Sequence, residues 1–278
     1  MKKLRQPYTL PAVLMLAICS SIAAHSSSGP TGQPAVDSAP LPDAPLPQAS
    51  DPFDSSTNEP VTLRNTPRHI LKDQAAIWTS PVRLRPHDAG WIIVLGLATT
   101  VAIASDHQAM SSVVSHDPKF NDRNVQASNV LTGAFIGVPA LMIAAGMFHP
   151  DSGVKEAGLL SGEAIIDGLA VEQGMKLIFW RERPFVDQYK GKFFQRSAGV
   201  DSGFPSSHSV LTWASAAVLA DEYNSRLSQL TIYTLATGVS LTRVLGQQHF
   251  PSDVLIGSAT GWLIGHYVYR HHHKDRLY

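Results

Sequence analysis

Apolar residues are concentrated in six segments after residue 90, and each segment is long enough to form a helix. Glycine and alanine are frequent in these segments, and valine and isoleucine do not alternate with polar residues as they do along a half-buried strand. The segments are residues 91–105, 128–148, 159–179, 210–220, 227–245 and 254–269. This pattern predicts an all-α domain, a helical bundle of about six core helices.

A shorter amphipathic stretch precedes the bundle, at residues 67–81. Its apolar residues recur at helical spacing, and charged residues occupy other positions around the turn. The apolar residues are Ile70, Leu71, Ile77 and Trp78, and the charged ones are Arg68, Lys72 and Asp73. Such a helix either lies on a membrane surface or packs on the domain, and we favour packing on the domain.

The first 24 residues have the organisation of a secretory signal peptide. Lys2, Lys3 and Arg5 form a basic start, and residues 10–24 are apolar, uncharged and end in small residues that suit cleavage. This stretch is too short to span a bilayer comfortably, although an uncleaved anchor helix is the alternative. We therefore expect an exported protein, located in the periplasm or the envelope.

Cys19 is the only cysteine, and it lies within the predicted signal peptide. As a lipoprotein signal it is weak, because Ile18 stands where a small residue is expected. Removal of the signal peptide would leave no cysteine, which excludes disulfides, a thiol nucleophile and a cysteine-based metal site.

Residues 25–60 contain eight of the 19 prolines, interspersed with Ser, Ala and Asp. This composition offers little to bury and supports neither a helix nor a central strand, so we expect a disordered linker. The predicted organisation is a signal peptide at residues 1–24, the linker at 25–60 and a helical domain at 61–278.

Whether the bundle crosses a membrane is not decided by the sequence. Segment 128–148 is the only one long enough and free enough of charge to span a bilayer unaided. Segment 159–179 carries charges that would be costly against lipid, and segment 210–220 is too short. The charges in question are Glu163, Asp167, Glu172 and Lys176. The pattern favours a compact exported bundle and leaves contact with the membrane open.

The chain has 22 basic and 22 acidic residues, so its formal net charge is zero. A protein without an excess of positive charge has no field that attracts nucleic acid, so we expect no nucleic-acid partner. Charged residues make up only 16% of the chain and apolar residues 44%. Such a composition fits a large buried core or a chain lying partly in lipid.

Two cations, Lys176 and Arg183, close the third apolar segment. They are seven residues apart, nearly two helical turns, so both side chains can project to the same side. Pro184 marks the end of the helix. Cations at a helix C-terminus also interact favourably with the helix dipole, so this patch alone indicates no more than solvated charge.

A second patch, Phe-Pro-Ser-Ser-His-Ser at residues 204–209, directly precedes an apolar segment. This composition suits a helix N-terminus, where free backbone N–H groups bind anions. Ser206 and Ser207 could donate hydroxyl and amide hydrogens to a phosphate, with His208 beside them to donate a proton. The alternative is an ordinary serine N-cap with His208 on the surface.

A third patch joins the last two apolar segments. Arg243 ends the first of them, Gly246 can break that helix, and Pro251 is a natural first residue of the next. His249 lies just before the second helix and Asp253 in its first turn. At this spacing the carboxylate can reach one imidazole nitrogen and leave the other free to attack. The alternative is a simple hydrogen-bonded pair.

In this order, the three patches resemble the signature of the type 2 phosphatidic acid phosphatase superfamily, which includes bacterial non-specific acid phosphatases and vanadium haloperoxidases. The signature is K-x6-R-P, then P-S-G-H, then S-R-x5-H-x3-D, and each spacing is kept here between about residues 159 and 269. Ser207 replaces the family's glycine and Thr242 its serine. Serine has the same backbone N–H as glycine, so the role survives where the backbone admits a Cβ.

The resemblance implies a role for each group. His249 would attack phosphorus, Asp253 would hold its tautomer, and His208 would protonate the leaving alcohol and then activate water. The residues implied to bind the phosphate are Lys176, Arg183, Ser206, Ser207 and Arg243. Phosphoryl transfer needs mainly positioning and charge stabilisation, which three cations and helix amides supply, so we expect no metal or other cofactor.

The implied substrate is a phosphate monoester: a lipid phosphate, a lipid pyrophosphate or a small ester. Residues 185–204 join two patches and are either a lid over the substrate entrance or an ordinary surface loop. No metal-spaced cluster stands beside the patches, and residues 271–273, three histidines, are expected to form an exposed basic tail.

Two other functions remain open at this stage. A vanadate-dependent haloperoxidase would use the same cradle, although the modest chain length and the spacing of about 30 residues between patches favour a phosphatase. A catalytically silent helical envelope protein would need neither the cations nor the histidines, so their presence argues against it.

Overall fold

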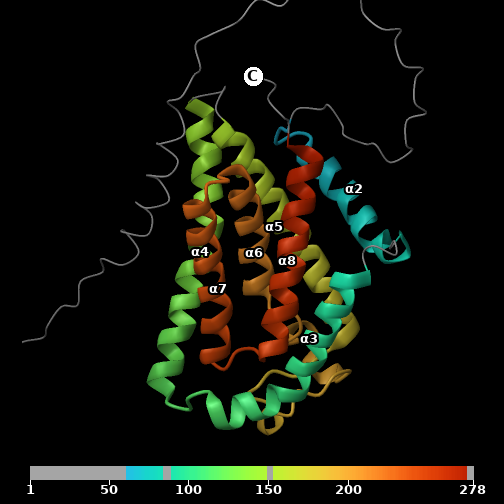
Figure 1. Ribbon diagram of the computed structural model, residues 1–278, viewed down its shortest axis with the longest axis vertical. Helices are drawn as coiled ribbons and strands as arrows, with labels where there is room; N and C mark the ends of the chain where they lie inside the picture. The colour runs from blue at the N-terminus through green and yellow to red at the C-terminus, as the bar shows by residue number, and fades with distance from the viewer. Residues whose placement is uncertain (1–60, 84–88, 149–152, 274–278) are drawn as a thin grey trace, which may run out of the picture. The chain divides into compact units, whose positions relative to one another are not determined.

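The computed structural model describes residues 61–83, 89–148 and 153–273, and every regular element within them is helical (Figure 1). The predicted all-α class is confirmed, whereas the predicted signal peptide and linker lie outside the described residues. The long helices are α2 (Thr66–Thr79), α3 (Ala89–Gln108), α4 (Pro118–Phe148), α5 (Gly153–Phe179), α6 (Ser207–Glu222), α7 (Arg226–Leu245) and α8 (Pro251–His272). The short helices are η1 (Ser80–Arg83), η3 (Ala109–Val113), η4 (Asp187–Tyr189) and η5 (Arg196–Asp201).

Helix α6 is the centre of the bundle, with α4, α5, α7 and α8 packed around it. Its closest partner is α8, which presents three glycines to it at intervals of four residues. A Cβ on Gly261 would lie 2.3 Å from the carbonyl oxygen of Val210, and one on Gly265 would lie 2.4 Å from that of Ala214. Only glycine admits such an approach, so these residues let the two backbones pack against each other.

The six predicted core helices correspond to α3 through α8, and only one boundary differs substantially. Helix α4 begins at Pro118, ten residues before the apolar segment predicted from residue 128. Pro118 suits the first helical position, and Asp117 accepts a hydrogen bond from the backbone N–H of Lys119 at 3.1 Å. A helix start made from polar groups is not visible in hydrophobic periodicity.

Helix α2 packs on the domain, as favoured from the sequence, through Ile77 and also through two polar residues that the sequence did not indicate. The side chains of His69 and Asp73 are buried, whereas Leu71 is 74% exposed. The packing face of α2 therefore combines polar residues with part of the expected apolar face, because Ile77 packs against the core and Trp78 lies against Gly174. The reason lies in its partners on α5 and α8, which are also polar.

The expected histidine tail is wrong in one respect. His271 is exposed at the end of α8, but the neighbouring His272 points inward and is only 8% exposed. Because residues on a helix are about 100° apart around the axis, adjacent histidines face different surroundings.

Two of the described helical segments are long and apolar enough to cross a membrane. They are Ala89–Val113, which includes α3 and η3, and Pro118–Phe148. In their most apolar windows only 6% and 33% of the residues are buried. The expectation that one segment alone would qualify is thus wrong, because α3 qualifies as well.

Candidate active site

The last turn of α5 places Lys176 against the first turn of α6. Lys176 Nζ lies 2.7 Å from Glu172 Oε1 and donates a hydrogen bond to Ser207 Oγ at 3.0 Å. Ser207 Oγ in turn donates to Glu172 Oε1 at 2.6 Å. Ser207 therefore directs its side chain toward Glu172 and Lys176. As the first residue of α6 it has no positive φ, so its Cβ is accommodated where the family has glycine.

Ser206 is the N-cap residue of α6, and it joins this helix to α8. Its backbone N–H donates to the carbonyl oxygen of Asp253 at 3.1 Å. Its Oγ is buried and makes no hydrogen bond. The first N–H groups of α6 have no acceptor within the helix, so they and this hydroxyl have hydrogen-bonding capacity for an anion.

His249 is buried between α7 and α8, and the hydrogen bond at its Nδ1 fixes its tautomer. Nδ1 lies 2.8 Å from the carbonyl oxygen of Gly203. A carbonyl can only accept, so Nδ1 carries the hydrogen and Nε2 carries the lone pair. The carboxylate of Asp253 lies 3.7 Å from Nδ1. Asp253 thus faces the imidazole, but the tautomer is held by the backbone of Gly203.

The two histidines lie within one group of cations. Burial, followed by the charges of Arg243, His249, Arg183 and Lys176, lowers the pKa of His208 to about 3. Burial and the charges of Arg183 and Arg243 hold the pKa of His249 well below its ordinary value. The three patches therefore converge, and both histidines are neutral at pH 7.

The two arginines are held by different partners. Arg183 Nε donates to the carbonyl oxygen of Asp201 at 3.0 Å, and Arg243 Nη1 donates to Ser128 Oγ at 3.2 Å. Arg243 Nε is buried and makes no hydrogen bond. Burial, and secondarily the charge of Arg183, lowers the pKa of Arg243 to about 10, so it remains a cation at pH 7. Both guanidinium groups thus keep hydrogen-bonding capacity for a ligand.

Arg181 was missed by the sequence analysis, and it is among the most buried side chains described. It donates to Asp253 Oδ1 at 2.5 Å, to Asp106 Oδ2 at 2.6 Å and to Ser252 Oγ at 2.6 Å. Its guanidinium lies between the rings of Phe193 and Phe250, at 4.5 and 4.3 Å. Arg181 therefore positions Asp253 and joins α3, the loop after α5 and α8.

Glu172 and Asn129 were also missed. Glu172 receives hydrogen bonds from both Lys176 and Ser207 as described above, and Asn129 Oδ1 lies 3.0 Å from His208 Nε2. The i,i+4 spacing of Glu172 and Lys176 on a helix could have indicated the contact that Glu172 makes. The contact of Asn129 with a residue 79 positions later had no local signal.

The segment after α5 folds back on the end of that helix. The backbone N–H of Phe194 donates to the carbonyl oxygen of Phe179 at 2.8 Å. The backbone N–H of Glu182 donates to the carbonyl oxygen of Lys192 at 3.0 Å. It is an ordered loop that includes η4 and η5. That this loop acts as a lid over the substrate entrance stays a prediction.

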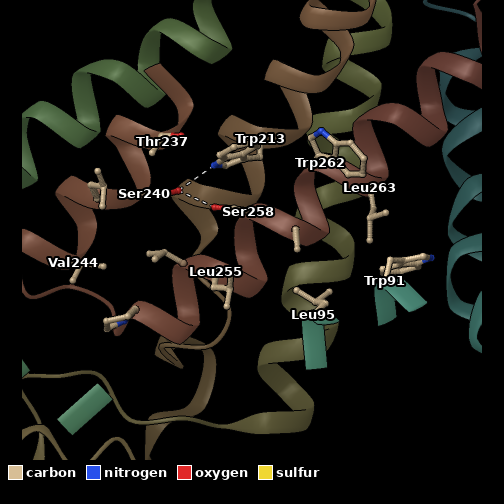
Figure 2. A pocket seen from close by; sticks show the side chains of 14 residues that line it. Trp91, Leu95, Trp213, Thr237, Ser240, Val244, Leu255, Ser258, Trp262 and Leu263 are labelled. Carbon is tan, nitrogen blue, oxygen red and sulfur yellow. Dashed lines mark hydrogen bonds between the residues drawn. The ribbon is translucent and has the colours of Figure 1, made fainter. Parts of the chain in front are cut away.

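An apolar pocket of about 740 Å³ lies among α3, α6, α7 and α8 (Figure 2). Trp213, Trp262 and Trp91 lie around it, and the only side-chain hydrogen bonds drawn across its wall join Ser240 to Trp213 and Ser258. Three lining residues are sequence neighbours of the site: Val244, Pro251 and Val254. The pocket is therefore an apolar compartment whose wall includes the residues that follow Arg243 and Asp253 in sequence.

Comparisons with known proteins give similarities to phosphatases. Residues 157–277 match the family model described as the PAP2 superfamily. A lipid A 1-phosphatase of Porphyromonas gingivalis is 34% identical over 70 residues, which are 24% of this chain and 16% of that protein. A lipid A 4'-phosphatase of the same species is 28% identical over 125 residues, 42% of this chain and 52% of that protein. The chain thus spans about half or less of these relatives.

Among solved structures, the chain is similar to a transmembrane PAP2 type phosphatidylglycerolphosphate phosphatase from Bacillus subtilis. The identity is 19%, the TM-score is 0.45, and the match covers 74% of this chain and 92% of that one.

Proposed function

Since residues 157–277 belong to the PAP2 superfamily, we propose that this protein is a phosphatase that hydrolyses phosphate monoesters through a phosphohistidine at His249. The observation that supports this most is the convergence of Lys176, Arg183 and Arg243 on two neutral histidines. Three cations and the N-terminus of α6 match the charge and the oxygens of a phosphoryl group.

In the first step, the lone pair on His249 Nε2 attacks phosphorus, and the bond from phosphorus to the alcohol oxygen breaks. The leaving oxygen takes a proton from His208, so the alcohol departs neutral. The positive charge that develops on His249 is stabilised by the Asp253 carboxylate, 3.7 Å from Nδ1. The Nδ1–H bond to Gly203 keeps Nε2 directed at the substrate.

In the second step, His208 is neutral and accepts a proton from a water molecule, whose oxygen attacks the phosphohistidine. The N–P bond breaks, and its electrons return to His249 Nε2. Lys176, Arg183 and Arg243 hold the three non-bridging oxygens in both steps, so the same cradle stabilises both transition states.

For the substrate class, we propose a phosphorylated lipid. Val244, Pro251 and Val254 line the apolar pocket and are sequence neighbours of the third patch, so an acyl or isoprenyl chain could occupy the pocket while the phosphate reaches the cations. A small polar ester has nothing to bury there. The relatives that act on lipid A by name point in the same direction.

For the location, we propose an exported protein of the envelope that is inserted in the membrane through α3 and α4. On α3, Val94, Leu97 and Val101 are each about two thirds exposed, and in water such a face would be a large apolar patch. Lipid contact removes this cost, and it also supplies lipid substrates to the adjoining pocket.

The test is phosphate release by the full chain, purified in detergent, from phosphatidic acid, an isoprenyl pyrophosphate and p-nitrophenyl phosphate. We expect the lipids to be preferred, vanadate to inhibit, and turnover to persist when a chelator is added to the assay. His249→Ala should lower kcat by about 10³-fold or more, whereas the exposed His271→Ala should not. Turnover that survives His249→Ala contradicts the mechanism, and halide oxidation by the vanadate-loaded protein favours the haloperoxidase.

A further inference from the structure

Two neighbouring residues of α4, Ser128 and Asn129, contact two groups of the candidate active site. Ser128 Oγ accepts a hydrogen bond from Arg243 Nη1 at 3.2 Å, and Asn129 Oδ1 lies 3.0 Å from His208 Nε2. Helix α4 precedes residues 157–277, which are the part of the chain that matches the family model. The family match therefore does not cover the residues that α4 brings to the site.

Further polar contacts between α4 and α6 fix the position of Asn129. One turn further along both helices, Thr132 Oγ1 lies 3.4 Å from Thr212 Oγ1. After another turn, Ser215 Oγ donates to the carbonyl oxygen of Phe135 at 2.9 Å. The three contacts recur at intervals of three or four residues on both helices, so they hold α4 and α6 in one register.

Helix α4 also packs closely on the end of α7. A Cβ on Gly246 would lie 2.8 Å from Val125 Cγ2, so a larger residue at this position would displace Val125. Ser128 Oγ donates to the carbonyl oxygen of Val125 at 2.8 Å, which leaves its lone pairs for Arg243. The helix that carries Asn129 is thus held in place by both α6 and α7.

The contact with Asn129 fixes the tautomer of His208. A side-chain amide oxygen only accepts, so Nε2 of His208 carries the ring hydrogen and Nδ1 carries the lone pair. Among the described residues, none makes a hydrogen bond to His208 Nδ1. Nδ1 is therefore the ring nitrogen available to a substrate.

A neutral acceptor suits a histidine that must both donate and accept a proton. In the proposed mechanism His208 gives a proton to the leaving oxygen and later takes one from water, and Nδ1 can serve both transfers. A carboxylate at Nε2 would stabilise the imidazolium and hold the proton on the ring. The amide of Asn129 adds no charge, so the ring can lose its proton in the first step and accept another in the second.

We propose that Asn129 is a positioning residue for His208, which it holds as the Nε2–H tautomer with Nδ1 directed at the leaving oxygen and then at the attacking water. This inference rests on the proposed function and adds a residue of α4 to the same site. Because Asn129 acts through His208, its loss should impair proton transfer more than substrate binding.

Asn129 lies in the mostly polar first third of α4 and is exposed, so its replacement leaves no cavity and the variants should fold. With p-nitrophenyl phosphate, breakdown of the phosphohistidine needs neutral His208, so the acidic limb of kcat reports the pKa of His208. In the full chain purified in detergent, Asn129→Asp should move this limb upward by about 1–3 pH units, because a carboxylate at Nε2 favours the imidazolium.

The matched control is Gln126→Glu, which adds the same charge at an exposed position one turn earlier on α4 and should leave the limb unmoved. Asn129→Leu removes the acceptor and keeps a side chain of similar size. It should lower kcat by about 10- to 100-fold, as a small misplacement of a catalytic group does, and change KM by less than about threefold. A limb that Asn129→Asp does not move, or that Gln126→Glu moves equally, overturns the proposal, as does a wild-type kcat in Asn129→Leu.

A measurement without turnover separates this proposal from the proposed function. In protein labelled with nitrogen-15 histidine, NMR of the ring nitrogens reports the tautomer, and the signals lost in His208→Gln identify His208. The wild type should show Nε2–H, and Asn129→Leu should show the Nδ1–H form as well. An Nδ1–H tautomer in the wild type overturns the positioning role. Absence of turnover in a wild type that has the Nε2–H tautomer would contradict the proposed function while supporting the contact with Asn129.

Discussion

At the residue scale, the role proposed for His208 requires a protonated imidazole, and its surroundings disfavour that protonation. In the proposed mechanism it must be protonated to assist the leaving alcohol, yet burial and the nearby cations lower its pKa to about 3 in the free site. A phosphate dianion brings the opposite charge into the same cradle and raises that pKa. His208 therefore acquires its proton together with the substrate.

This coupling predicts proton uptake on binding an oxyanion. Tungstate, a dianion at pH 7, should bind with the uptake of about one proton, because His208 is neutral before binding and charged after it. Calorimetry in buffers of different ionisation enthalpy measures the number. His208→Gln should bind tungstate with little uptake, and equal uptake by both proteins would contradict the role given to His208.

The residues with local sequence signals were predictable, and those held by long-range contacts were not. The eight proposed site residues stand at fixed spacing near helix ends. Arg181 lies between two of them in sequence, but its partners Asp106 and Asp253 are 75 and 72 residues away. Nor does spacing show that the backbone of Gly203, rather than Asp253, receives the His249 Nδ1–H.

At the element scale, Arg181 joins α3 to α8. Asp106 accepts from Arg181 and from the backbone N–H of Ser252 at 3.1 Å, so the first turn of α8 is held by a carboxylate on α3. The same guanidinium holds Asp253, so the position of α3 and the geometry of the active site depend on one residue.

Arg181→Met should accordingly destabilise the protein by about 3 kcal/mol or more, because it leaves two buried carboxylates without the cation that pairs with them. For a domain of this size, the Tm would fall by about 6–12 °C in thermal unfolding. The matched control is Arg196→Met, because Arg196 is exposed and contacts only the Trp180 ring, at 5.8 Å, among the interactions described. Equal Tm values for the two variants would show that Arg181 does not join the helices.

Helices were predictable as elements because each core helix contains a continuous apolar segment. Two features depended on polar contacts and could not be predicted from that pattern. The start of α4 is set by Asp117 and Pro118, and the packing face of α2 is set by His69 and Asp73. In both cases tertiary or capping interactions override the apolar periodicity.

At the scale of the whole molecule, the cationic site lies toward the end of the bundle where α6 and α8 begin (Figure 1), and the apolar pocket extends from Pro251 at the start of α8 to Leu263 near its middle. The buried polar residues His69, Asp73, Glu163, Asp167 and His272 lie toward the other end, where α8 has its last turn. Helices α3 and α4 present apolar surface to the surroundings, and in the proposed membrane-inserted arrangement a lipid would reach the pocket from within the bilayer.

Membrane insertion predicts how the protein fractionates. After cell disruption and an alkaline wash, the chain should stay in the membrane pellet and enter solution only with detergent, because the exposed surfaces of α3 and α4 would otherwise meet water. A peripheral protein held by charge would be released by the wash. Release of most of the chain would contradict insertion through α3 and α4.

The central claim is a phosphoryl group carried by His249, and the most direct measurement is to trap it. With p-nitrophenyl phosphate, whose leaving group needs little help from an acid, His208→Ala should still be phosphorylated but should release phosphate slowly for want of a base. Quenching in alkali, where phosphohistidine is stable, and mass spectrometry of the peptides should find the group on His249. No phosphorylated peptide, or one that persists in a His208→Ala/His249→Ala double variant, would contradict the mechanism.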